Sequence, residues 1–334
     1  MTPIDFLSSR FHYTYGAHAP TLQVQPGDAI RVTCPDCDNV MADGSVLTEE
    51  QRHVDTPDAV QGNPLAGPIY IEDAKPGDTL AVTINAVELD RELGMTLLAP
   101  SHGVLPDHRV TPLIGDEKNA GSPTTPRHMY HWQIDTTAGT ATMSNPVGGQ
   151  ALSVQLDPFV GCIGVCPAKG CEVSSLNCGE FGGNLDLPMV RPGTTVFLPV
   201  NREGALLMMG DLHAAQGHGE VIGGGIETSG KIVCTVGIIK GAGIESCRMR
   251  DSQMLWAIGT HDDLQQAIQL AYAGLLDWLA QPGVVDRYDM YNLLSQTATV
   301  TVGNLNEAPY PAAAGVRLDR LPDAVIEAIK PWTL

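Results

Sequence analysis

The chain has 334 residues, 43% of them hydrophobic, and a formal net charge of −19 at pH 7. This length and composition predict a globular protein with a large core, and no run approaches the roughly 18 to 20 apolar residues of a membrane-spanning helix. The negative charge argues against nucleic acid and anionic membranes as partners, because both are bound through basic patches.

The N-terminus and the cysteines predict a cytoplasmic protein. The first residues lack the basic segment followed by an apolar segment that is typical of a secretory signal, and the eight cysteines are then expected to be reduced thiols. Cys34 and Cys37 form a CxxC pair, but no second pair follows at zinc-ribbon spacing. We therefore interpret most of the cysteines as small buried apolar residues.

Proline followed by glycine precedes a strand-like run at three places, which are Gln25–Val32, Lys75–Val82 and Arg191–Leu198. Proline presets φ at the second position of a turn and glycine accepts positive φ at the third, so each pair predicts a type II turn that leads into a strand. Further strands are predicted at Leu80–Leu89, Met129–Ile134 and Gly161–Val165. The polar, proline-containing region Val104–Arg127 between them is expected to be a long loop.

Helical periodicity appears only late in the chain. Five apolar residues fall on one helical face, capped by Asp262 or Asp263, and they are Leu264, Ile268, Ala271, Leu275 and Leu279. Pro282 and Gly283 are expected to end this helix, and further helices are expected at Val285–Leu294 and Pro322–Ile329. The prediction is a mainly β, single domain over residues 1–334, β-rich to about residue 258, helical over about 261–296, and then returning to the C-terminus.

The segment Gly204–Thr228 is the strongest candidate site. An apolar run at 205–209 predicts a short buried strand, and the glycine-rich sequence after it predicts a loop. This segment carries six side chains that can bind a metal or transfer a proton, namely Asp211, His213, Gln216, His218, Glu220 and Glu227. Such a loop behind a buried strand is typical of active sites, although an acidic, solvated hairpin is the alternative.

Asp211 and His213 are two residues apart and would face the same side of an extended strand. Together with Asp36 in an earlier loop, they form a carboxylate and imidazole set that suits zinc, or a harder divalent ion if the carboxylates dominate. Taken singly, Asp211 could be a turn residue and His213 a buried, hydrogen-bonded histidine.

A second loop, Cys178–Asp186, contains two adjacent glycines and places Asn184 and Asp186 on one face. It either lines the pocket, with Asn184 contacting substrate, or forms a turn stabilised by the Asn and Asp side chains. The sequence lacks a GxSxG elbow, a P-loop, a dinucleotide-binding GxGxxG unit and an HExxH motif, so the enzyme classes built on them are not indicated.

Five motifs occur in one order along the chain and resemble the acetamidase/formamidase family. They are Asn63-Pro-x-x-Gly-Pro-Ile69, Pro76-Gly-Asp78, Gly161-x-x-Gly-x-x-Pro167, Gly182-Gly-Asn-x-Asp186 and Gly210-Asp-x-His-x-x-Gln-Gly-x-Gly-Glu220. The resemblance implies hydrolysis of short aliphatic amides to a carboxylate and ammonia, in a β-sandwich or barrel-like fold with appended helices. It also implies a homodimer or higher homo-oligomer and a divalent metal, zinc in the first place and calcium as the alternative.

We assign a role to each candidate site residue from the chemistry of its side chain, not from the family. Asp36, Asp211 and His213 are predicted to hold the metal. Glu220 is the predicted general base, with Gln216 and Asn184 orienting the substrate amide, and the substrate-binding residues are Asp186, Glu227 and His218. His218 and Ala66 depart from the family pattern, which leaves room for a larger amide, a carbamate or a thioamide. The alternatives are a thiol hydrolase using Cys37, Cys166 or Cys178, and a non-catalytic binding protein on the same scaffold.

Overall fold

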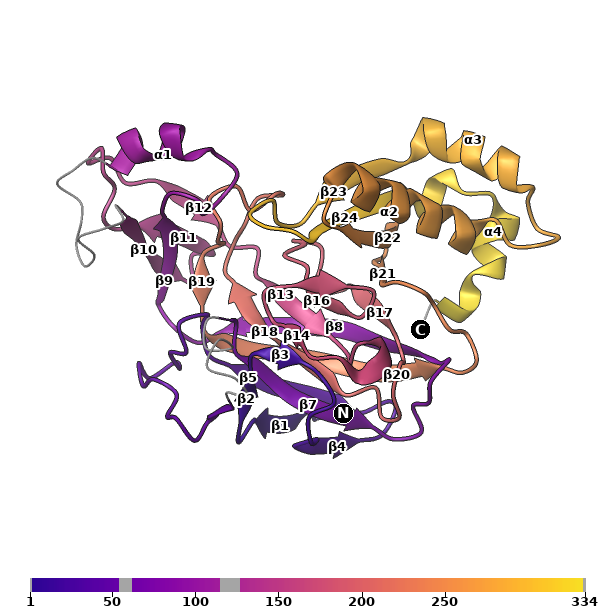
Figure 1. Ribbon diagram of the computed structural model, residues 1–334, viewed down its shortest axis with the longest axis horizontal. Helices are drawn as coiled ribbons and strands as arrows, with labels where there is room; N and C mark the ends of the chain where they lie inside the picture. The colour runs from indigo at the N-terminus through magenta and orange to yellow at the C-terminus, as the bar shows by residue number, and fades with distance from the viewer. Residues whose placement is uncertain (1, 54–61, 115–126, 333–334) are drawn as a thin grey trace.

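The computed structural model describes residues 2–53, 62–114 and 127–332. It contains two large β-sheets and a small two-stranded sheet, with the longer helices gathered in the last part of the chain (Figure 1). The predicted mainly β fold with a helical segment in the C-terminal quarter is confirmed.

One sheet contains nine strands among the described residues. In order across the sheet they are β1 (Ile4–Leu7), β5 (Ala29–Cys34), β20 (Gly230–Ile239), β8 (Thr79–Leu89), β17 (Thr195–Pro199), β21 (Arg248–Arg250), β22 (Met254–His261), β24 (Tyr310–Arg317) and β23 (Thr299–Val302). The alternation of β5 puts Ile30, Val32 and Cys34 into the core. Side chains of this sheet share one hydrophobic cluster with side chains of the second sheet.

The second sheet has thirteen described strands and carries most of the site. Its main path is β12 (Ser153–Gln155), β11 (Thr140–Met143), β10 (His128–Asp135), β9 (Leu93–Leu98), β19 (Glu227–Thr228), β18 (Leu207–His213), β13 (Phe159–Gly164), β16 (Gly182–Asn184) and β15 (Cys178–Gly179). Beside this path lie β2 (Phe11–His12), β4 (Leu22–Val24), β6 (Arg52–His53) and β7 (Leu65–Ile71), while β3 (Thr14–Tyr15) and β14 (Val173–Ser174) form the small sheet.

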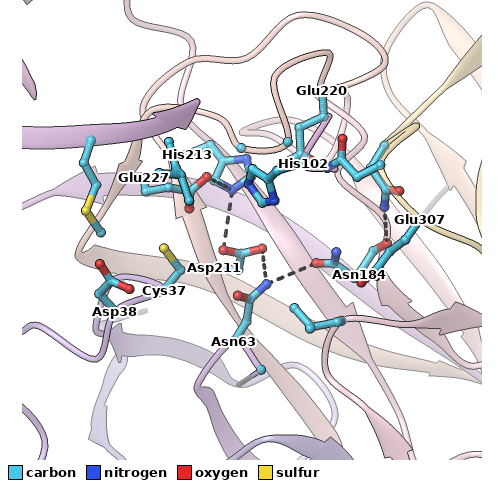
Figure 2. A pocket seen from close by; sticks show the side chains of 18 of the residues that line it. Cys37, Asp38, Asn63, His102, Asn184, Asp211, His213, Glu220, Glu227 and Glu307 are labelled. Atoms are coloured by element: carbon cyan, nitrogen blue, oxygen red, sulfur yellow. Dashed lines mark hydrogen bonds and ion pairs between the residues drawn. The ribbon is translucent and has the colours of Figure 1, made fainter. Parts of the chain in front are cut away.

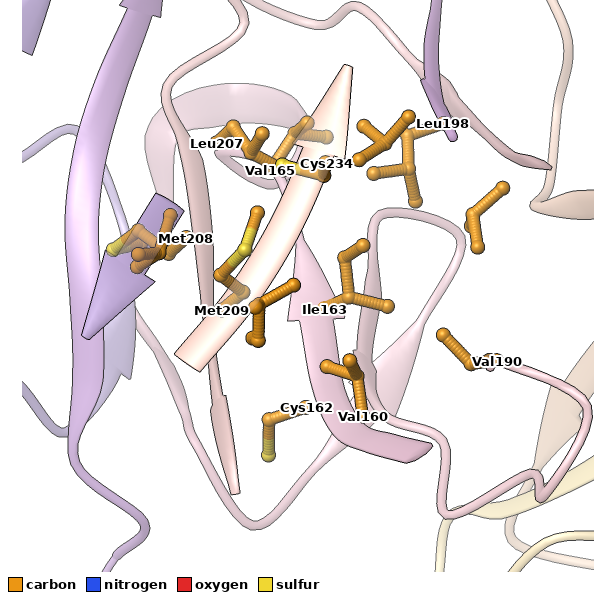
Figure 3. Packing of buried hydrophobic residues seen from close by; sticks show 14 of the residues in the cluster. Val160, Cys162, Ile163, Val165, Val190, Leu198, Leu207, Met208, Met209 and Cys234 are labelled. Atoms are coloured by element: carbon orange, nitrogen blue, oxygen red, sulfur yellow. The ribbon is translucent and has the colours of Figure 1, made fainter. Parts of the chain in front are cut away.

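Strands β13 and β18 are buried along their whole length. Side chains from both strands pack in one hydrophobic cluster, including Val160, Ile163, Leu207 and Met209 (Figure 3). A strand covered on both faces reads as a continuous apolar run, which is why 205–209 shows no alternation. This packing fixes the strand that presents Asp211 and His213.

The three Pro-Gly pairs lead into strands as predicted. Gly27, Gly77 and Gly193 have φ of 98°, 92° and 92°, and the strands that follow them are β5, β8 and β17. The predicted strands at 80–89, 129–134 and 161–165 correspond to β8, β10 and β13. Local turn chemistry therefore predicted much of the β framework.

The C-terminal helices pack on strands β22 and β24 of the nine-stranded sheet. They are α2 (Leu264–Leu279), α3 (Arg287–Thr297) and α4 (Asp323–Ala328), with short 3-10 turns at η4 (Leu318–Arg320) and η5 (Lys330–Trp332). A further 3-10 turn, η3 (Ala168–Gly170), lies between β13 and β14. The Asp263 carboxylate caps α2 by accepting a hydrogen bond from the Gln266 backbone N–H at 2.9 Å. Within the described part of the chain, none of the helices combines the length and hydropathy needed to cross a membrane.

The expected loop at Val104–Arg127 is partly wrong. The structure has a helix there, α1 (Asp107–Ile114), and the rest of the segment, residues 115–126, lies outside the described residues. Val110 is buried against Leu98 of β9, which stabilises the helix from outside the segment. A helix of eight residues is too short to show a clear periodicity in the sequence.

Candidate metal and catalytic site

Strand β18 ends in a cavity of about 540 Å³ at the thirteen-stranded sheet (Figure 2). Five of the predicted site residues line this cavity, and they are Asn184, Asp211, His213, Glu220 and Glu227. Other lining residues come from the loop at 37–39, from β9 and β10, and from the segment after β23. The site is thus built from parts of the chain that are far apart in sequence.

Strand β18 begins later and ends later than the predicted apolar strand. Ala205 and Leu206 have left-handed φ values of 57° and 61°, so the strand starts at Leu207 and continues to His213. Asp211 therefore lies within the strand, although its own φ is 60°. Its Oδ1 is 3.5 Å from His213 Nε2, so the two side chains meet as predicted.

The imidazole of His213 is held on both sides. Its Nδ1 is 2.7 Å from Gln216 Oε1, and Gln216 Nε2 donates to the Asp186 carbonyl at 2.9 Å. Because Gln216 presents an acceptor, Nδ1 carries the proton, and Nε2 points toward Asp211 and Glu227 Oε1, which is 3.0 Å away. An outer hydrogen bond of this kind fixes the tautomer in which Nε2 can bind a metal. Gln216 was predicted to orient substrate, but it lies outside the cavity lining and contacts His213.

Two overlapping groups of buried side chains could hold a metal ion. One is Asp211, His213 and Glu227, and the other is Asp186, His213 and Glu220; within each group the ligand atoms lie within 4.8 Å of one another. A Cβ added at Gly161 would lie 2.7 Å from both Asp186 Oδ1 and Asp211 Oδ2. Gly161 therefore provides the space in which these two carboxylates converge.

The charges of this cluster are unbalanced. Burial, followed by the charge of Asp211, raises the pKa of Asp186 to about 8, and burial also raises the pKa values of Glu220 and Glu227. Burial alone would lower the pKa of His213, but Glu227 and Asp211 outweigh it and raise that pKa. No lysine or arginine is among the described residues that line the cavity. A divalent cation would supply the missing positive charge.

One atom of the cluster has no hydrogen-bond partner among the described residues. Asp186 Oδ1 is buried without a hydrogen bond, whereas Oδ2 of the same carboxylate accepts from Asn304 Nδ2 at 3.1 Å. A buried carboxylate oxygen is costly to leave unpaired, and a cation bound nearby, at Asp211, would lower that cost. Carboxylates with one imidazole suit zinc or a harder divalent ion, so the residues present fit the implied metal.

Glu220 is held at the cavity by a residue that the sequence did not indicate. Its φ is 45°, a strained value for glutamate, and its Oε2 accepts a hydrogen bond from Asn306 Nδ2 at 2.8 Å. Asn304 and Asn306 follow β23, and a parallel bridge joins Asn304 to Gly219. An Asn-x-Asn sequence between two strands is weak evidence for a site, which is why both residues were missed.

Asn63 is a second missed residue. Its Nδ2 donates to Asp211 Oδ2 at 2.8 Å and lies 3.3 Å from Asn184 Oδ1 (Figure 2). The Cys162 thiol also lies 2.9 Å from Asn184 Oδ1, so this amide oxygen is engaged within the protein. Asn63 belongs to the first motif of the predicted family pattern, and that was the available signal.

Asp36 and His218 lie outside the cavity lining. Asp36 Oδ2 forms a 2.8 Å ion pair with Arg91, and its Oδ1 accepts from the backbone N–H groups of Asp38 and Val40. It therefore shapes the loop whose next residues, Cys37 and Asp38, line the cavity. His218 is exposed and its Nδ1 is 2.7 Å from Thr301 Oγ1. Neither residue belongs to the two metal-capable groups.

The cysteines of the alternative mechanism are poorly placed for it. Cys37 lines the cavity, but Cys166 and Cys178 are buried and lie outside its lining. Burial raises the pKa of all three thiols, so each is protonated near neutral pH. A nucleophilic cysteine requires the thiolate, which these surroundings disfavour.

Comparisons with known proteins relate the chain to one family. The acetamidase/formamidase family model matches residues 7–177 and 172–263. A formamidase from Methylophilus methylotrophus is 29% identical over 65% of this chain and 61% of its own length. An acetamidase from Mycolicibacterium smegmatis is 28% identical over 65% of this chain and 63% of its own length. The chain thus matches less than two thirds of the length of these relatives.

Solved structures show the same fold over nearly the whole chain. A predicted acetamidase/formamidase from the thermophile Thermoanaerobacter tengcongensis gives a TM-score of 0.78 at 24% identity and covers 98% of both chains. An acetamidase from Yersinia enterocolitica gives a TM-score of 0.75 at 27% identity, with 96% of this chain and 93% of that chain covered. The family model spans more than half of the sequence, and the chain therefore belongs to the acetamidase/formamidase family.

Proposed function

We propose that this protein is a metal-dependent amidase that hydrolyses short aliphatic amides to a carboxylate and ammonia. The observation that carries the proposal is the pair of buried Asp, His and Glu groups that share His213, whose members other than Asp186 line one cavity. Relatives named formamidase and acetamidase support the reaction class. For this reaction the cavity has to bind a small neutral amide, activate a water molecule and transfer a proton to the departing nitrogen.

The proposed metal ligands are Asp211, His213 and Glu227. A divalent cation bound there, zinc with calcium as the alternative, would act as a Lewis acid. It would polarise the amide carbonyl and lower the pKa of a bound water molecule. Glu227 takes the place first predicted for Asp36, because Asp36 already pairs with Arg91 while Glu227 contacts His213 directly. Gln216 holds His213 in the binding tautomer, and Asn63 orients Asp211 through a hydrogen bond.

Glu220 is the proposed general base and acid. It accepts a proton from the attacking water and later donates it to the departing nitrogen, which is the usual order for a carboxylate in amide hydrolysis. Asn306 fixes the Glu220 carboxylate at the cavity. Asn184 lines the same cavity and contributes an amide near the substrate, while Asp186 lies behind it as part of the charge cluster.

The protein is further proposed to be a cytoplasmic homodimer or higher homo-oligomer. All eight cysteines are free thiols, which supports a reducing compartment. Light scattering coupled to size-exclusion chromatography tests the oligomer directly. A mass equal to the 35.4 kDa of one chain would contradict it.

The test of the function is ammonia release from formamide, acetamide and propionamide, before and after chelation and after zinc is added back. Release that is lost on chelation and restored by zinc supports the proposal. Release that is indifferent to chelation keeps the amidase but contradicts the metal mechanism. No release from folded, zinc-loaded protein contradicts the amidase and favours a binding protein.

A matched pair of variants sharpens this test. His213→Gln should abolish both zinc binding and ammonia release, because His213 belongs to both metal-capable groups. His108→Gln changes an exposed histidine of α1 outside the cavity and should leave both unchanged. Equal losses in the two variants would remove His213 from the site.

A further inference from the structure

One wall of the cavity is apolar and lacks core partners. Met95 and Leu97 of β9 and Met129 of β10 form this wall, and each is only partly buried. Leu176, which also lines the cavity and is partly buried, belongs to a different segment, after β14. None of the four belongs to the hydrophobic clusters formed by the described residues. Apolar side chains that face a cavity rather than a core contribute favourable free energy when a ligand covers them and removes them from water.

The strand register places this wall directly beside the proposed metal ligands. Met95 is paired with Glu227 of β19, and Leu97 is paired with Met129 of β10. Met95 and Leu97 share one face of β9, while Thr96 between them turns to the other face and accepts a hydrogen bond from Trp132 Nε1. The wall therefore starts beside Glu227 and extends along β9 for roughly 7 Å, the length of two strand residues.

The opposite side of the cluster is polar. Glu220 and Glu227 lie on different sides of His213 (Figure 2), and Glu220 accepts a hydrogen bond from Asn306 Nδ2. A departing ammonia molecule needs the proton donor, so the amide nitrogen would face Glu220. The acyl group would then point toward Glu227 and along the apolar wall.

The volume of the cavity and the charges of its lining residues restrict the class of substrate further. The acyl group of acetamide has a single methyl beyond its carbonyl, which leaves most of a 540 Å³ cavity and nearly all of the wall uncovered. Pockets of roughly 300 to 1,000 Å³ generally hold ligands much larger than this. Because no lysine or arginine is among the described lining residues, and Asp38 and Glu307 are, an anionic substrate would be repelled.

We infer that the preferred substrate class is a neutral primary amide whose acyl chain, on the order of four to six carbons, lies along β9 against Met95, Leu97 and Met129. The inference rests on the proposed amidase function and specifies the acyl group of its substrate. The wall, not the metal cluster, then determines which amides react best.

The experiment measures kcat/KM for acetamide, butyramide, pentanamide and hexanamide with the full-length, zinc-loaded protein. Each methylene that reaches the wall should raise kcat/KM by roughly twofold to fourfold, because burying a methylene is worth about that factor in binding. N-butylacetamide, which carries the alkyl chain on the nitrogen, should show no such increase in kcat/KM over acetamide. The inference is overturned if kcat/KM is highest for acetamide, or if it increases more for N-butylacetamide than for the longer primary amides.

A pair of variants on one face of β9 provides the control. Leu97→Asn should lower the ratio of the hexanamide to the acetamide kcat/KM by about tenfold, because only the longer acyl chain extends along the wall. Leu93→Asn makes the same change two residues before Met95, at an exposed position outside the cavity lining, and should leave the ratio unchanged. If Leu97→Asn does not fold, Met129→Thr tests the paired position across the sheet. An unchanged ratio in the folded wall variant overturns the inference.

Calorimetric binding of the same amides separates the two proposals. Affinity that rises with chain length and falls in the wall variant supports the wall even if no ammonia is released, an outcome that contradicts only the amidase function. Ammonia release from acetamide together with equal affinity for acetamide and hexanamide contradicts only the acyl-chain inference.

Discussion

At the scale of single residues, the candidate site consists of side chains held in unfavourable surroundings. Asp186, Asp211 and Glu220 all have positive φ values, between 45° and 60°, and all three are buried. Strained backbone and buried charge of this kind persist only where the surrounding structure enforces them, and they concentrate at functional sites. The site therefore depends on neighbours such as Asn306 and Gly225, which carry no charge of their own.

The proposed role of Glu220 is tested by Glu220→Gln. This variant keeps the size of the side chain and removes the proton-transferring carboxylate, so kcat should fall on the order of 10²-fold or more with the fold retained. Glu307→Gln is the control, because Glu307 lines the same cavity but belongs to neither metal-capable group. The measurement is the steady-state kcat of both variants with acetamide as the substrate. Turnover at the native rate in folded Glu220→Gln would remove Glu220 from the mechanism.

The placement of His213 depends on a glycine. A Cβ at Gly225 would lie 2.6 Å from His213 Cγ and 2.7 Å from Nδ1, so Gly225→Ala should displace the imidazole and weaken zinc binding at least tenfold. Gly217→Ala is the matched control from the same segment, since a Cβ there meets nothing within 4 Å. Zinc titration of both variants is the measurement, and equal affinities would contradict this packing argument.

At the scale of elements, the turns before the strands do more than reverse the chain. Asp78, in the Pro-Gly-Asp turn before β8, accepts hydrogen bonds from the backbone N–H groups of Lys75 and Gly241 and pairs with Lys240. It thereby connects the start of β8 to the end of its neighbour β20. Burial opposes the Asp78 charge, but these donors outweigh burial and lower its pKa below the ordinary value of 3.8.

The direction of that pKa shift predicts a pH dependence. Because the pKa of Asp78 is lower in the folded than in the unfolded protein, its stabilisation is complete above about pH 4 and is lost as pH falls through the folded-state pKa. Asp78→Asn should reduce the free energy of unfolding by about 1 to 2 kcal/mol at pH 7. Urea unfolding from pH 7 to pH 3 is the measurement. A difference between the two proteins that grows toward acid pH would have the wrong sign.

At the scale of the whole molecule, the site couples segments that are distant in sequence. Strand β18 supplies Asp211 and His213, β19 supplies Glu227, and the segment after β23 supplies Asn304 and Asn306. The cluster brings several carboxylates together in a buried place, where their repulsion opposes folding. A metal ion would connect these segments and relieve that repulsion. The single-domain organisation of residues 1–334 stays a prediction, which limited proteolysis would test.

Removal of the metal should therefore lower stability as well as activity. A ligand that binds only the folded state stabilises it by about 2.7 kcal/mol when its free concentration is a hundred times its Kd. The Tm should fall on chelation and return when zinc is added, and His213→Gln should show neither change. Calorimetric melts of the chelated and zinc-loaded protein are the measurement. Identical Tm values would contradict a metal at this cluster.

The sequence by itself determined the features that depend on near neighbours. The Pro-Gly turns, the capped helix α2 and the meeting of Asp211 with His213 all follow from preferences that act over a few residues. The motif Gly210–Glu220 also indicated the family through one continuous stretch. Even the buried strand was visible, as an apolar run, although its exact limits depended on the left-handed conformations of Ala205 and Leu206.

Only the tertiary structure decided which distant groups share the cavity. The pairing of Asp36 with Arg91, the approach of Asn63 to Asp211 across 148 sequence positions, and the bond from Asn306 to Glu220 depend on the order of strands in the sheets. The apolar wall likewise exists because β9 lies between β10 and β19. Strand order results from packing over the entire chain, and no local sequence pattern encodes it.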